Sequence, residues 1–528
     1  MRITNKIMQN NNLNNINTNK IYQDILSNQM STQKKVNRPS DDPVVAIRAL
    51  RLRGNVTEVT QYYSKNIPDA KSWLEVTEDA LDNLTAVITD MISQATKGSN
   101  GDLTSADRQT IIEQLQALSD EVYSTGNADY AGRYVFTGYR TDTPLCFTKE
   151  ENINYTITEQ LSSENIDIVT SVTTMSASGD DFMDINAANY ANNDVSLTDV
   201  KSVDVYRIRL AYNDLNAGYT PTISYIDPAQ KDANGEYIPQ TLTLTIVHDY
   251  ENPYNRMAEM NKANPNTPAA IFIPETGEML LSDAAYAVLK DTKDLPATSE
   301  VDEGEIRITY QKEDWANGTL RPEHYFACSH PDGDGGTIEY NASYLTRAVN
   351  EKNQVIEYDV GFTQTIQVNS MAEECFYHGI GREVNDLVSS MQEVVDMEAI
   401  IKELETAKSN ASGAAAEALQ KKLDIANKTY DYMKDKTQKL YEASITTFQG
   451  YLDSANLAVT SCGTRSGKLA LIETRMQTQK TTFETLKSEN EDADITEVAI
   501  KLSSAELTYE AALMATGKIM QTTLLNFI

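Results

Sequence analysis

Long amphipathic helices are predicted at both ends of this 528-residue chain, on either side of a segment without helical periodicity. At 494–528 apolar residues recur in alternating steps of three and four, which is the spacing of one narrow helical seam. The same spacing recurs at 44–97. Such seams predict helices that pack along their whole length against other helices. The seam of the last helix consists of Ile495, Val498, Leu502, Ala505, Tyr509, Ala512, Thr516 and Ile519.

The sequence closes on the apolar run TTLLNFI, which contains Leu524 and Phe527. A soluble protein rarely exposes such residues unless a partner covers them, so we expect assembly rather than catalysis. Residues 1–37 are rich in Asn, a mediocre helix former. We expect this segment to be disordered in water and helical only against a partner. Its sparse apolar points are Ile3, Ile7, Leu13, Ile16, Ile21 and Ile25.

The motif RPSDDP at 38–43 separates two helical segments. Pro39 and Pro43 forbid a continuous helix, and Pro43 suits a first helical turn that Asp41 or Asp42 caps. With Arg38, these residues are expected to form an elbow, either as a structural turn or as a contact between subunits. Farther along, Pro68 is expected to interrupt the helix before its register resumes. Thr104 with Asp107 then resembles a capping box at the start of a shorter helix, and a hairpin is expected at 130–139.

The middle of the chain changes character. Residues 145–375 hold short β-type runs between Asp, Asn, Gly and Pro clusters, with a helix near 283–290. Helical periodicity then returns in three runs, and a turn is expected at 409–416, within an extra helical hairpin whose placement stays open. The three runs are 384–401, 419–440 and 469–486.

The chain is therefore predicted to be an α+β protein, in which long N- and C-terminal helices form a coiled-coil rod and a β-rich domain is inserted between them. An inner coiled-coil domain is expected at 1–43 and 491–528. The helical rod domain is expected at 44–144 and 376–490. The inserted outer domain, in one or two parts, is expected at 145–375.

Charge excludes two classes of partner. The chain holds 77 acidic and 45 basic residues, a net charge of −32, and such a surface repels phosphate backbones and anionic lipids. Neither nucleic acid nor a membrane is an expected partner. No stretch approaches the roughly 18 apolar residues of a membrane span. The N-terminal residues lack the apolar core of a secretory signal, so a cytoplasmic protein or export without a cleaved signal is expected.

Candidates for chemistry are few. The four cysteines make no metal-type pair and are expected to be reduced thiols. The densest group of possible metal ligands in the sequence is predicted to be a polar turn between strands rather than a metal site, because paired ligands are absent nearby. We expect no catalytic residues, no cofactor and no metal, since no hydrolase, metalloprotease or nucleotide-binding motif occurs. That constellation comprises His324, Cys328, His330, Asp332 and Asp334.

Surface charges near the predicted helix ends have plain interpretations. Glu491, Asp492 and Asp494 are interpreted as a solvated linker and as helix N-terminal charges. The arginines of the 44–97 helix are predicted either to pair with acidic residues of adjacent subunits or to form a solvated face. These arginines are Arg48, Arg51 and Arg53.

Several blocks of the sequence resemble the flagellin superfamily, and within it the junction proteins that join hook to filament in bacterial flagella. The blocks are RPSDDPVVAIRALRLR at 38–53, NIPDAKSWLEVTEDAL at 66–81, YAGRYVFTGYRTDTPL at 130–145 and SSAELTYEAALMATGKIMQTTLLNFI at 503–528. The resemblance covers roughly 1–147 and 362–528, and the β insertion carries no family motif.

This resemblance implies a structural protein, not an enzyme, exported through the flagellar type III apparatus and placed extracellularly at the hook–filament junction. Its terminal helices form an inner tube, and its ends fold only on assembly. The implied partners are copies of itself in a ring, the other hook–filament junction protein, flagellin, and a cytoplasmic export chaperone that holds the C-terminal segment. The alternatives are a minor flagellin of the filament and, from another class, a carbohydrate-binding or enzymatic activity in the inserted β domain.

Overall fold

The computed structural model describes residues 5–521 apart from 177, 234, 297, 299–303, 334 and 348–353. The chain divides into two compact units. The first and last segments of the sequence belong to the same one, which we call the terminal unit. The terminal unit comprises Met1–Lys71, Tyr358–Ile366 and Gly467–Ile528, and the central unit comprises Ser72–Glu357 and Gln367–Ser466.

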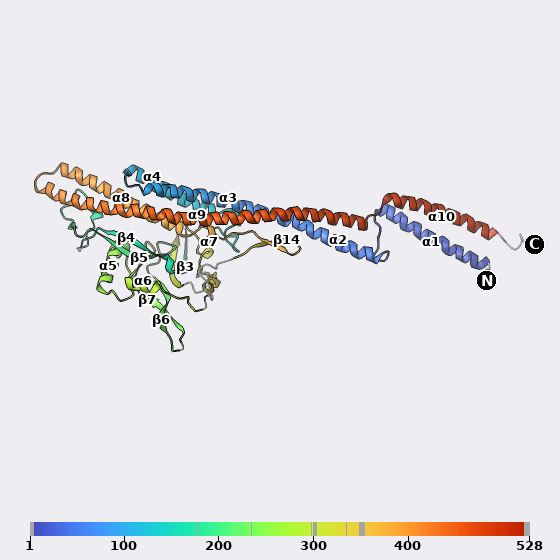
Figure 1. Ribbon diagram of the computed structural model, residues 1–528, viewed down its shortest axis with the longest axis horizontal. Helices are drawn as coiled ribbons and strands as arrows, with labels where there is room; N and C mark the ends of the chain where they lie inside the picture. Colours follow the sequence, from blue (N-terminus) through green and yellow to red (C-terminus); the bar gives the residue numbers. More distant parts are fainter. Residues whose placement is uncertain are drawn as a thin grey trace, which may run out of the picture. The chain divides into compact units, whose positions relative to one another are not determined.

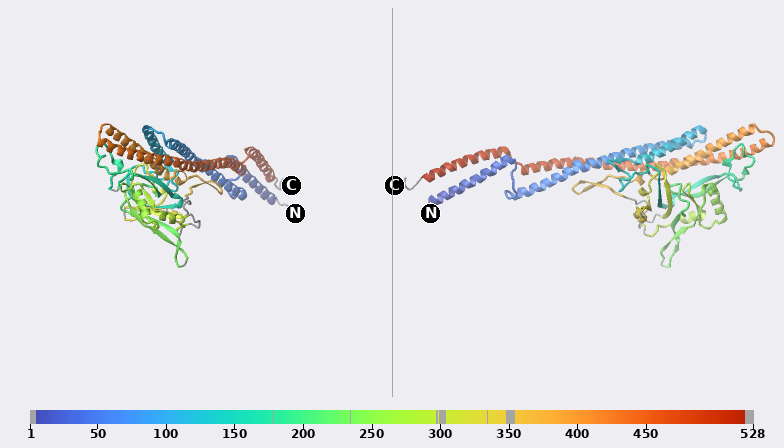
Figure 2. Two further views of the ribbon diagram at one scale, coloured as in Figure 1. Left: turned by 60° about the vertical axis from the view of Figure 1, so that its left-hand side comes forward. Right: turned by 180° about the vertical axis from the view of Figure 1, so that it is seen from behind.

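Helices dominate the terminal unit (Figure 1). Helices α1 (Asn5–Thr32) and α10 (Ile495–Gln521) lie side by side in each view (Figure 2). They run antiparallel, because residue 26 shares a core cluster with residue 498 while residues 12 and 512 line one groove. Helix α2 (Pro43–Gln61) follows the RPSDDP motif. The helices predicted near 44–97 and 494–528 are confirmed, the second as far as Gln521, and residues 522–528 lie outside the described residues.

The predicted interruption at Pro68 takes the form of a widened turn rather than a break. Helix α2 continues through a π-helical turn, Tyr62–Asn66, into α3 (Ile67–Gly98). In that turn the N–H of Ile67 donates to the carbonyl of Tyr62, five residues earlier. Pro68 follows as the second residue of α3, directly after this wider turn. The wider turn explains how the apolar register survives the proline.

A short hairpin packs on this helix within the terminal unit. Strands β14 (Glu357–Gly361) and β15 (Gln364–Gln367) pair with each other. The ring of Phe362, at the hairpin tip, contacts Tyr62 and Phe483 edge to face, with centroids 5.9 and 6.3 Å away. β15 confirms the strand predicted from FTQTIQV.

In the central unit, α4 (Ser105–Gly126) begins with the predicted capping box of Thr104 and Asp107. Helices α8 (Gly379–Ser409) and α9 (Ala414–Glu491) form the predicted hairpin, with the turn between them closed by Gly413 at a φ of +62°. The prediction of two separate helices after that turn is wrong, because α9 is one helix of 78 residues. Its internal glycines weaken a helix by about 1 kcal/mol each without ending it, and no proline follows.

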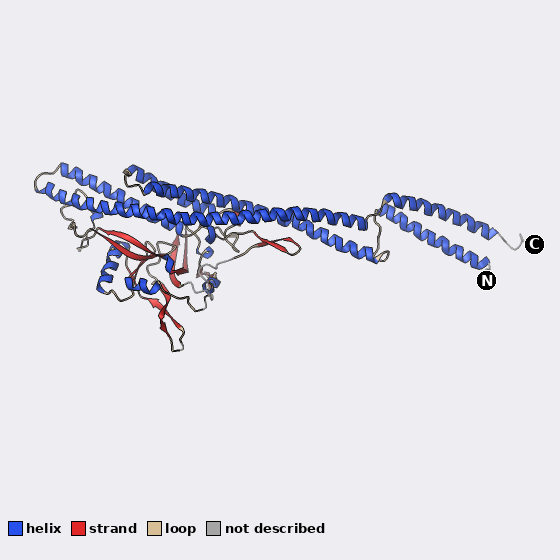
Figure 3. Cartoon of the chain, viewed as in Figure 1, coloured by secondary structure: helices blue, strands red, loops and turns tan. Residues whose placement is uncertain are grey.

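Two sheets form the inserted β-rich part of the central unit (Figure 3). The five-stranded sheet has the order β4 (Ile166–Thr173), β5 (Lys201–Arg209), β10 (Glu278–Leu281), β9 (Ala270–Ile273), β8 (Leu244–Ile246). The six-stranded sheet has the order β13 (Thr337–Tyr340), β12 (Ala327–Pro331), β3 (Glu151–Ser162), β11 (Glu305–Trp315), β6 (Thr222–Lys231), β7 (Tyr237–Leu242). Neighbouring strands of both sheets pair antiparallel, except that β8 and β9 are parallel.

Most of these strands match predicted β-type runs, and α6 (Asp283–Leu289) confirms the helix expected near 283–290. The hairpin of β1 (Asp129–Tyr130) and β2 (Arg133–Tyr134) confirms the one expected near 130–139. The elements that the sequence analysis missed include β4, β12, β14 and α5 (Pro253–Ala263). β4 follows β3 after a three-residue 3₁₀ turn without Gly or Pro, so no breaker marks its start.

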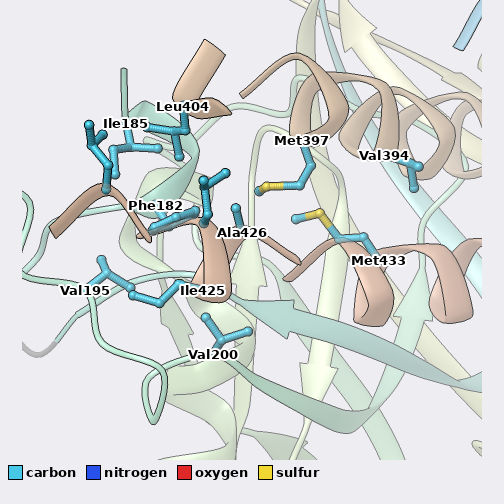
Figure 4. Packing of buried hydrophobic residues seen from close by; sticks show 12 residues of the cluster. Phe182, Ile185, Val195, Val200, Val394, Met397, Leu404, Ile425, Ala426 and Met433 are labelled. Atoms are coloured by element: carbon cyan, nitrogen blue, oxygen red, sulfur yellow. The ribbon is translucent and has the colours of Figure 1, made fainter. Parts of the chain in front are cut away.

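A segment of the insertion completes the helical hairpin, whose placement the sequence left open (Figure 4). Phe182 and Val195 lie in one core with Met397 of α8 and Met433 of α9. The Lys422 ammonium of α9 donates to the carbonyls of Asn193 and Val195, at 2.6 and 2.9 Å. The tip of the hairpin therefore folds together with this part of the insertion.

A buried ion network connects β5 to α8 in the central unit. Arg207 donates two hydrogen bonds to Asp167, at 3.2 and 2.7 Å, and one to Asp386, at 2.9 Å. It also pairs with Glu278, whose other oxygen accepts from the Tyr254 hydroxyl at 2.7 Å. Charge-assisted bonds of this density fix the sheet against the helix.

Candidate assembly site in the terminal helices

The face of α1 that lies against α10 is mostly polar. Along α1 the positions shielded from solvent step by three and four residues, as expected for one helix face against another. Five of the seven are amides, and only Leu26 is fully buried. The seven positions are Gln9, Asn12, Ile16, Asn19, Gln23, Leu26 and Gln29. Helix α1 therefore buries little apolar surface against its neighbour.

Most apolar side chains of α1 point elsewhere. Ile7 and Leu13, both predicted as assembly residues, are exposed, while Ile16 is half-buried on the inner face. Ile21 and Ile25 are exposed as well. Helix α1 thus turns a mostly polar face toward α10 and leaves most of its apolar side chains in solvent, the opposite of a helix that packs on a hydrophobic core.

Helix α10 turns its predicted seam toward α1. Val498 and Ala505 are buried in a small core with Leu26, and Leu502 packs against it. Tyr509 and Ala512 are half-buried farther along, whereas Ile495 is exposed at the start of the helix. This seam therefore already has a partner within the chain.

A second apolar stripe of α10, which the periodicity argument missed, faces solvent. Ile500, Leu507 and Met514 are 67%, 70% and 67% exposed and recur every seventh residue. Seven residues are two helical turns, so the three side chains lie on one line. In the sequence, the eight positions of the predicted seam form a more prominent pattern than the three residues of this second stripe. We call these residues the outer stripe.

A polar groove of about 350 Å³ opens between the two helices away from their small core. In the described part of the chain, the side-chain amides of Asn12, Asn15 and Asn19 donate no hydrogen bond across it to α10. The contact between the helices is therefore loosest in this region. The groove is lined by Asn12, Asn15, Thr18, Asn19, Ala512, Ala515 and Thr516.

Four predicted assembly residues cannot be placed in this geometry. Ile3, Leu524 and Phe527 lie outside the described residues, and the side chain of Ile519 does so too. Their assembly role stays a prediction.

The predicted elbow has the expected local geometry. The Asp42 carboxylate caps α2 by accepting from the N–H groups of Val44 and Val45, and Pro43 is the first helical residue. Asp41 accepts from the N–H of Arg38 at 2.9 Å. Arg38 and Pro39 are exposed.

The interpretation of Glu491 as part of a solvated linker is wrong, because Glu491 is the last residue of α9 and is buried. The Glu491 side chain is only 4% exposed, and its two oxygens accept from Arg53 at 2.6 and 2.8 Å. The hydrogen bonds from Arg53 hold the pKa of Glu491 below its ordinary value, against the opposing effect of burial. Arg53 is thus paired within its own chain. Asp494, by contrast, caps α10 as expected of a helix N-terminal charge.

The constellation around His324 supports no metal site. His324 is buried, which lowers its pKa to about 4, and its Nε2 lies 3.0 Å from the carbonyl of Pro144. Cys328 is buried, and His330 contacts the Tyr340 hydroxyl instead. In the described ranges no three His, Cys, Asp or Glu side chains gather as metal ligands. Asp334 lies outside those ranges.

The N-terminal helices match a known protein family. Residues 3–141 match the model of the bacterial flagellin N-terminal helical region. The matched segment covers α1 to α4 and the first hairpin, which include the inner face of α1 and the elbow. This part of the chain is therefore similar to the N-terminal helical region of bacterial flagellins. None of the helices in the described part of the chain is both long and apolar enough to cross a bilayer.

Two curated relatives carry the name flagellar hook-associated protein 3. The Salmonella typhimurium protein is 33% identical over 144 residues, or 27% of this chain and 45% of its own length. The Escherichia coli protein is 36% identical over 117 residues, 22% of this chain and 36% of its own. The chain thus spans less than half the length of these relatives. A flagellin of Clostridium tyrobutyricum is 26% identical over 180 residues, 34% of this chain and 46% of its own.

Among solved structures, FlgL of Xanthomonas campestris is 12% identical, with a TM-score of 0.27, over 82% of this chain and 98% of that one.

Proposed function

We propose that this chain is a structural subunit of the bacterial flagellum that connects the hook to the flagellin filament and has no catalytic role. The matched relatives named for the hook-associated protein support the junction over the filament itself. The proposed partners are copies of this chain in a ring, the hook-side junction protein and flagellin. A cytoplasmic chaperone is proposed to hold the C-terminal segment before export through the flagellar apparatus to the cell exterior.

One observation carries the proposal: α1 presents mostly amides to α10, the apolar core between the two helices is small, and many of their other apolar side chains are exposed. Exposed apolar side chains in a line mark a surface that another protein covers. The outer stripe of α10 and the exposed isoleucines of α1 together offer such a surface on both helices.

The mechanism follows from the balance of two free energies. Ordering a residue costs about 1–2 kcal/mol in backbone entropy. The weak α1–α10 contact offsets little of this cost in a single chain, whereas burial of the outer stripe between copies adds roughly 25 cal/mol per Å². Folding of the ends and assembly then occur together, and contacts between unlike faces of identical subunits build a ring or a tube.

A minor flagellin of the filament is the alternative, favoured by the flagellin match. Immunogold labelling separates the two. Label confined to the hook–filament boundary supports the junction subunit, and label along the filament supports the alternative.

The outer stripe is tested by the triple variant Ile500→Gln, Leu507→Gln, Met514→Gln in the full chain. Gln keeps helix propensity but not apolar surface, so secondary structure by circular dichroism is expected to stay unchanged. Cells that produce only this variant are expected to release flagellin into the medium and to lose most of their filaments, counted by electron microscopy.

Leu457→Gln is the matched control, because Leu457 is 71% exposed on α9 in the central unit. It is expected to leave the filament number unchanged. Normal filaments in cells with the triple variant would contradict the proposal.

A further inference from the structure

Two segments next to the terminal helices are bound to each other: Gln33–Lys35, which follows α1, and Glu489–Ala493, which includes the last residues of α9 and precedes α10. We call these two segments the linkers. The N–H of Lys35 donates to the carbonyl of Glu491 at 2.7 Å, and the N–H of Ala493 donates to the carbonyl of Gln33 at 2.9 Å. These two bonds make an antiparallel bridge between segments more than 450 residues apart in sequence. We call Gln33–Lys35, Glu489–Ala493 and Arg53 together the joint.

Side chains reinforce this bridge from every element around it. Arg53 of α2 donates from Nε and Nη2 to the two carboxylate oxygens of Glu491. Lys34 lies 3.6 Å from the same carboxylate and also pairs with Asp492. The Asn490 side chain donates to the carbonyl of Val45 in α2 at 3.2 Å. A buried carboxylate with a bidentate arginine is a strong, geometrically specific contact.

The backbone at the joint is also constrained. Gln33 ends α1 at a φ of +59°, a conformation that residues with a side chain seldom adopt. Its N–H still donates to Gln29 at 2.9 Å, and the Gln29 side chain donates to the carbonyl of Lys35 at 2.7 Å. The surrounding bonds hold the residue in this conformation.

Packing between α1 and α10 declines with distance from the joint. The small apolar core of Leu26, Val498 and Ala505 lies at the joint end of the pair. The polar groove lined by Asn12 and Ala512 lies farther out. The contact is therefore strongest where the two helices leave the linkers.

We propose that the joint is the nucleus from which the two terminal helices order, with Glu491 as the residue that holds both linkers. Starting a helix is the unfavourable step of its formation, and bringing two distant segments together has its own entropic cost. The joint brings the two segments together and fixes the adjoining ends of α1 and α10 before assembly. Both helices can therefore extend from ends that are already adjacent and oriented. The role of the joint in assembly rests on the proposed function, whereas the contacts that form the joint lie within a single chain.

Hydrogen exchange of the full-length chain in dilute solution, read by mass spectrometry, tests this inference. In the wild-type chain, peptides covering both linkers are expected to be protected, and exchange in α1 and α10 to rise with distance from the joint. Glu491→Gln removes the charge with little change of shape. It is expected to speed exchange at least tenfold in both linkers, and to speed exchange in both helices together.

Two further variants sharpen the test. Glu497→Gln is the matched control, since Glu497 pairs with Lys501 at 2.7 Å on the surface of α10; it is expected to leave linker exchange unchanged. The swap Arg53→Glu with Glu491→Arg restores opposite charges and is expected to recover part of the protection.

Unchanged linker exchange in Glu491→Gln would overturn the inference, as would loss of protection in only one linker or wild-type linkers that exchange like an unfolded chain. These outcomes are independent of the outer stripe. The two tests can give different answers. If the joint is protected from exchange but the triple variant of the outer stripe still builds filaments, the proposed function is refuted and the inference about the joint is not.

Discussion

The guanidinium of Arg207, whose side chain is only 5% exposed, is surrounded by three carboxylates of the central unit. Removing a charged group from water costs several kcal/mol, and only dense pairing compensates for it. Asp386 is central to that pairing, because it accepts from Arg207 at 2.9 Å and from Arg209 at 2.7 Å. Burial alone raises the pKa of Asp386, but the arginines outweigh burial and lower it.

Asp386→Asn is therefore expected to destabilise the central unit by about 3–5 kcal/mol, because it leaves two buried guanidinium groups short of one negative charge. Urea unfolding followed by tryptophan fluorescence measures the loss. Asp435→Asn serves as control, since Asp435 forms only an exposed pair with Lys439 at 2.7 Å. That control is expected to change stability by less than about 0.5 kcal/mol.

The same carboxyl gives a pH dependence with a definite sign. A group whose pKa is lowered by folding stabilises the folded chain at pH values above its unfolded pKa, about 3.9 for Asp. That contribution is lost as the pH falls through the lower, folded pKa. The difference in urea midpoint between wild type and Asp386→Asn is expected to be constant from pH 7 to 5 and to shrink under more acidic conditions. A difference that grew in acid would contradict the assignment.

At the scale of elements, the hairpin of α8 and α9 depends on the insertion for its core. Packing two antiparallel helices on each other leaves part of their apolar faces uncovered. Here the segment around 182–200 packs on the apolar side chains of α8 and α9 that remain. The β insertion is thus part of the helical architecture of the central unit.

Phe182→Ala is expected to destabilise the hairpin tip by about 3–5 kcal/mol, since it removes a fully buried ring. Faster hydrogen exchange around Leu404 and Leu419 is the measurement. Leu197→Ala, a partly exposed position of the same segment, is the control with little expected effect. Equal effects of the two variants would show that the segment does not fill the core.

Local signals predicted most elements, and long-range contacts explain the failures. The capping box at Thr104 and the seam of α10 depend on neighbours within four residues, and both were found. Glu491 was misjudged because its partner Arg53 lies 438 residues away. The inner face of α1 was misjudged because apolar residues were assumed to pack inward, whereas amides do so here.

At the scale of the whole molecule, charge is divided unequally between the units. The terminal unit holds 17 basic and 15 acidic residues, and the central unit holds 28 basic and 62 acidic residues. The surface proposed for assembly is thus nearly neutral, while the central units of neighbouring copies repel one another.

Raising salt from 50 mM to 500 mM is therefore expected to favour association of the full chain, because it screens this repulsion without weakening apolar contacts. The second virial coefficient from light scattering is expected to fall steadily across this range. A coefficient that rose with salt would show that ion pairs between copies, rather than apolar surfaces, drive association.

The joint has a consequence for copies that are cut short during synthesis. Lys34 and Arg53 find their partners only when the chain has been made as far as residue 492. A truncated copy carries a complete α1 with nothing to anchor it. If the joint orders both terminal helices as proposed, incorporation into the growing structure selects polypeptides that were made at least as far as residue 493.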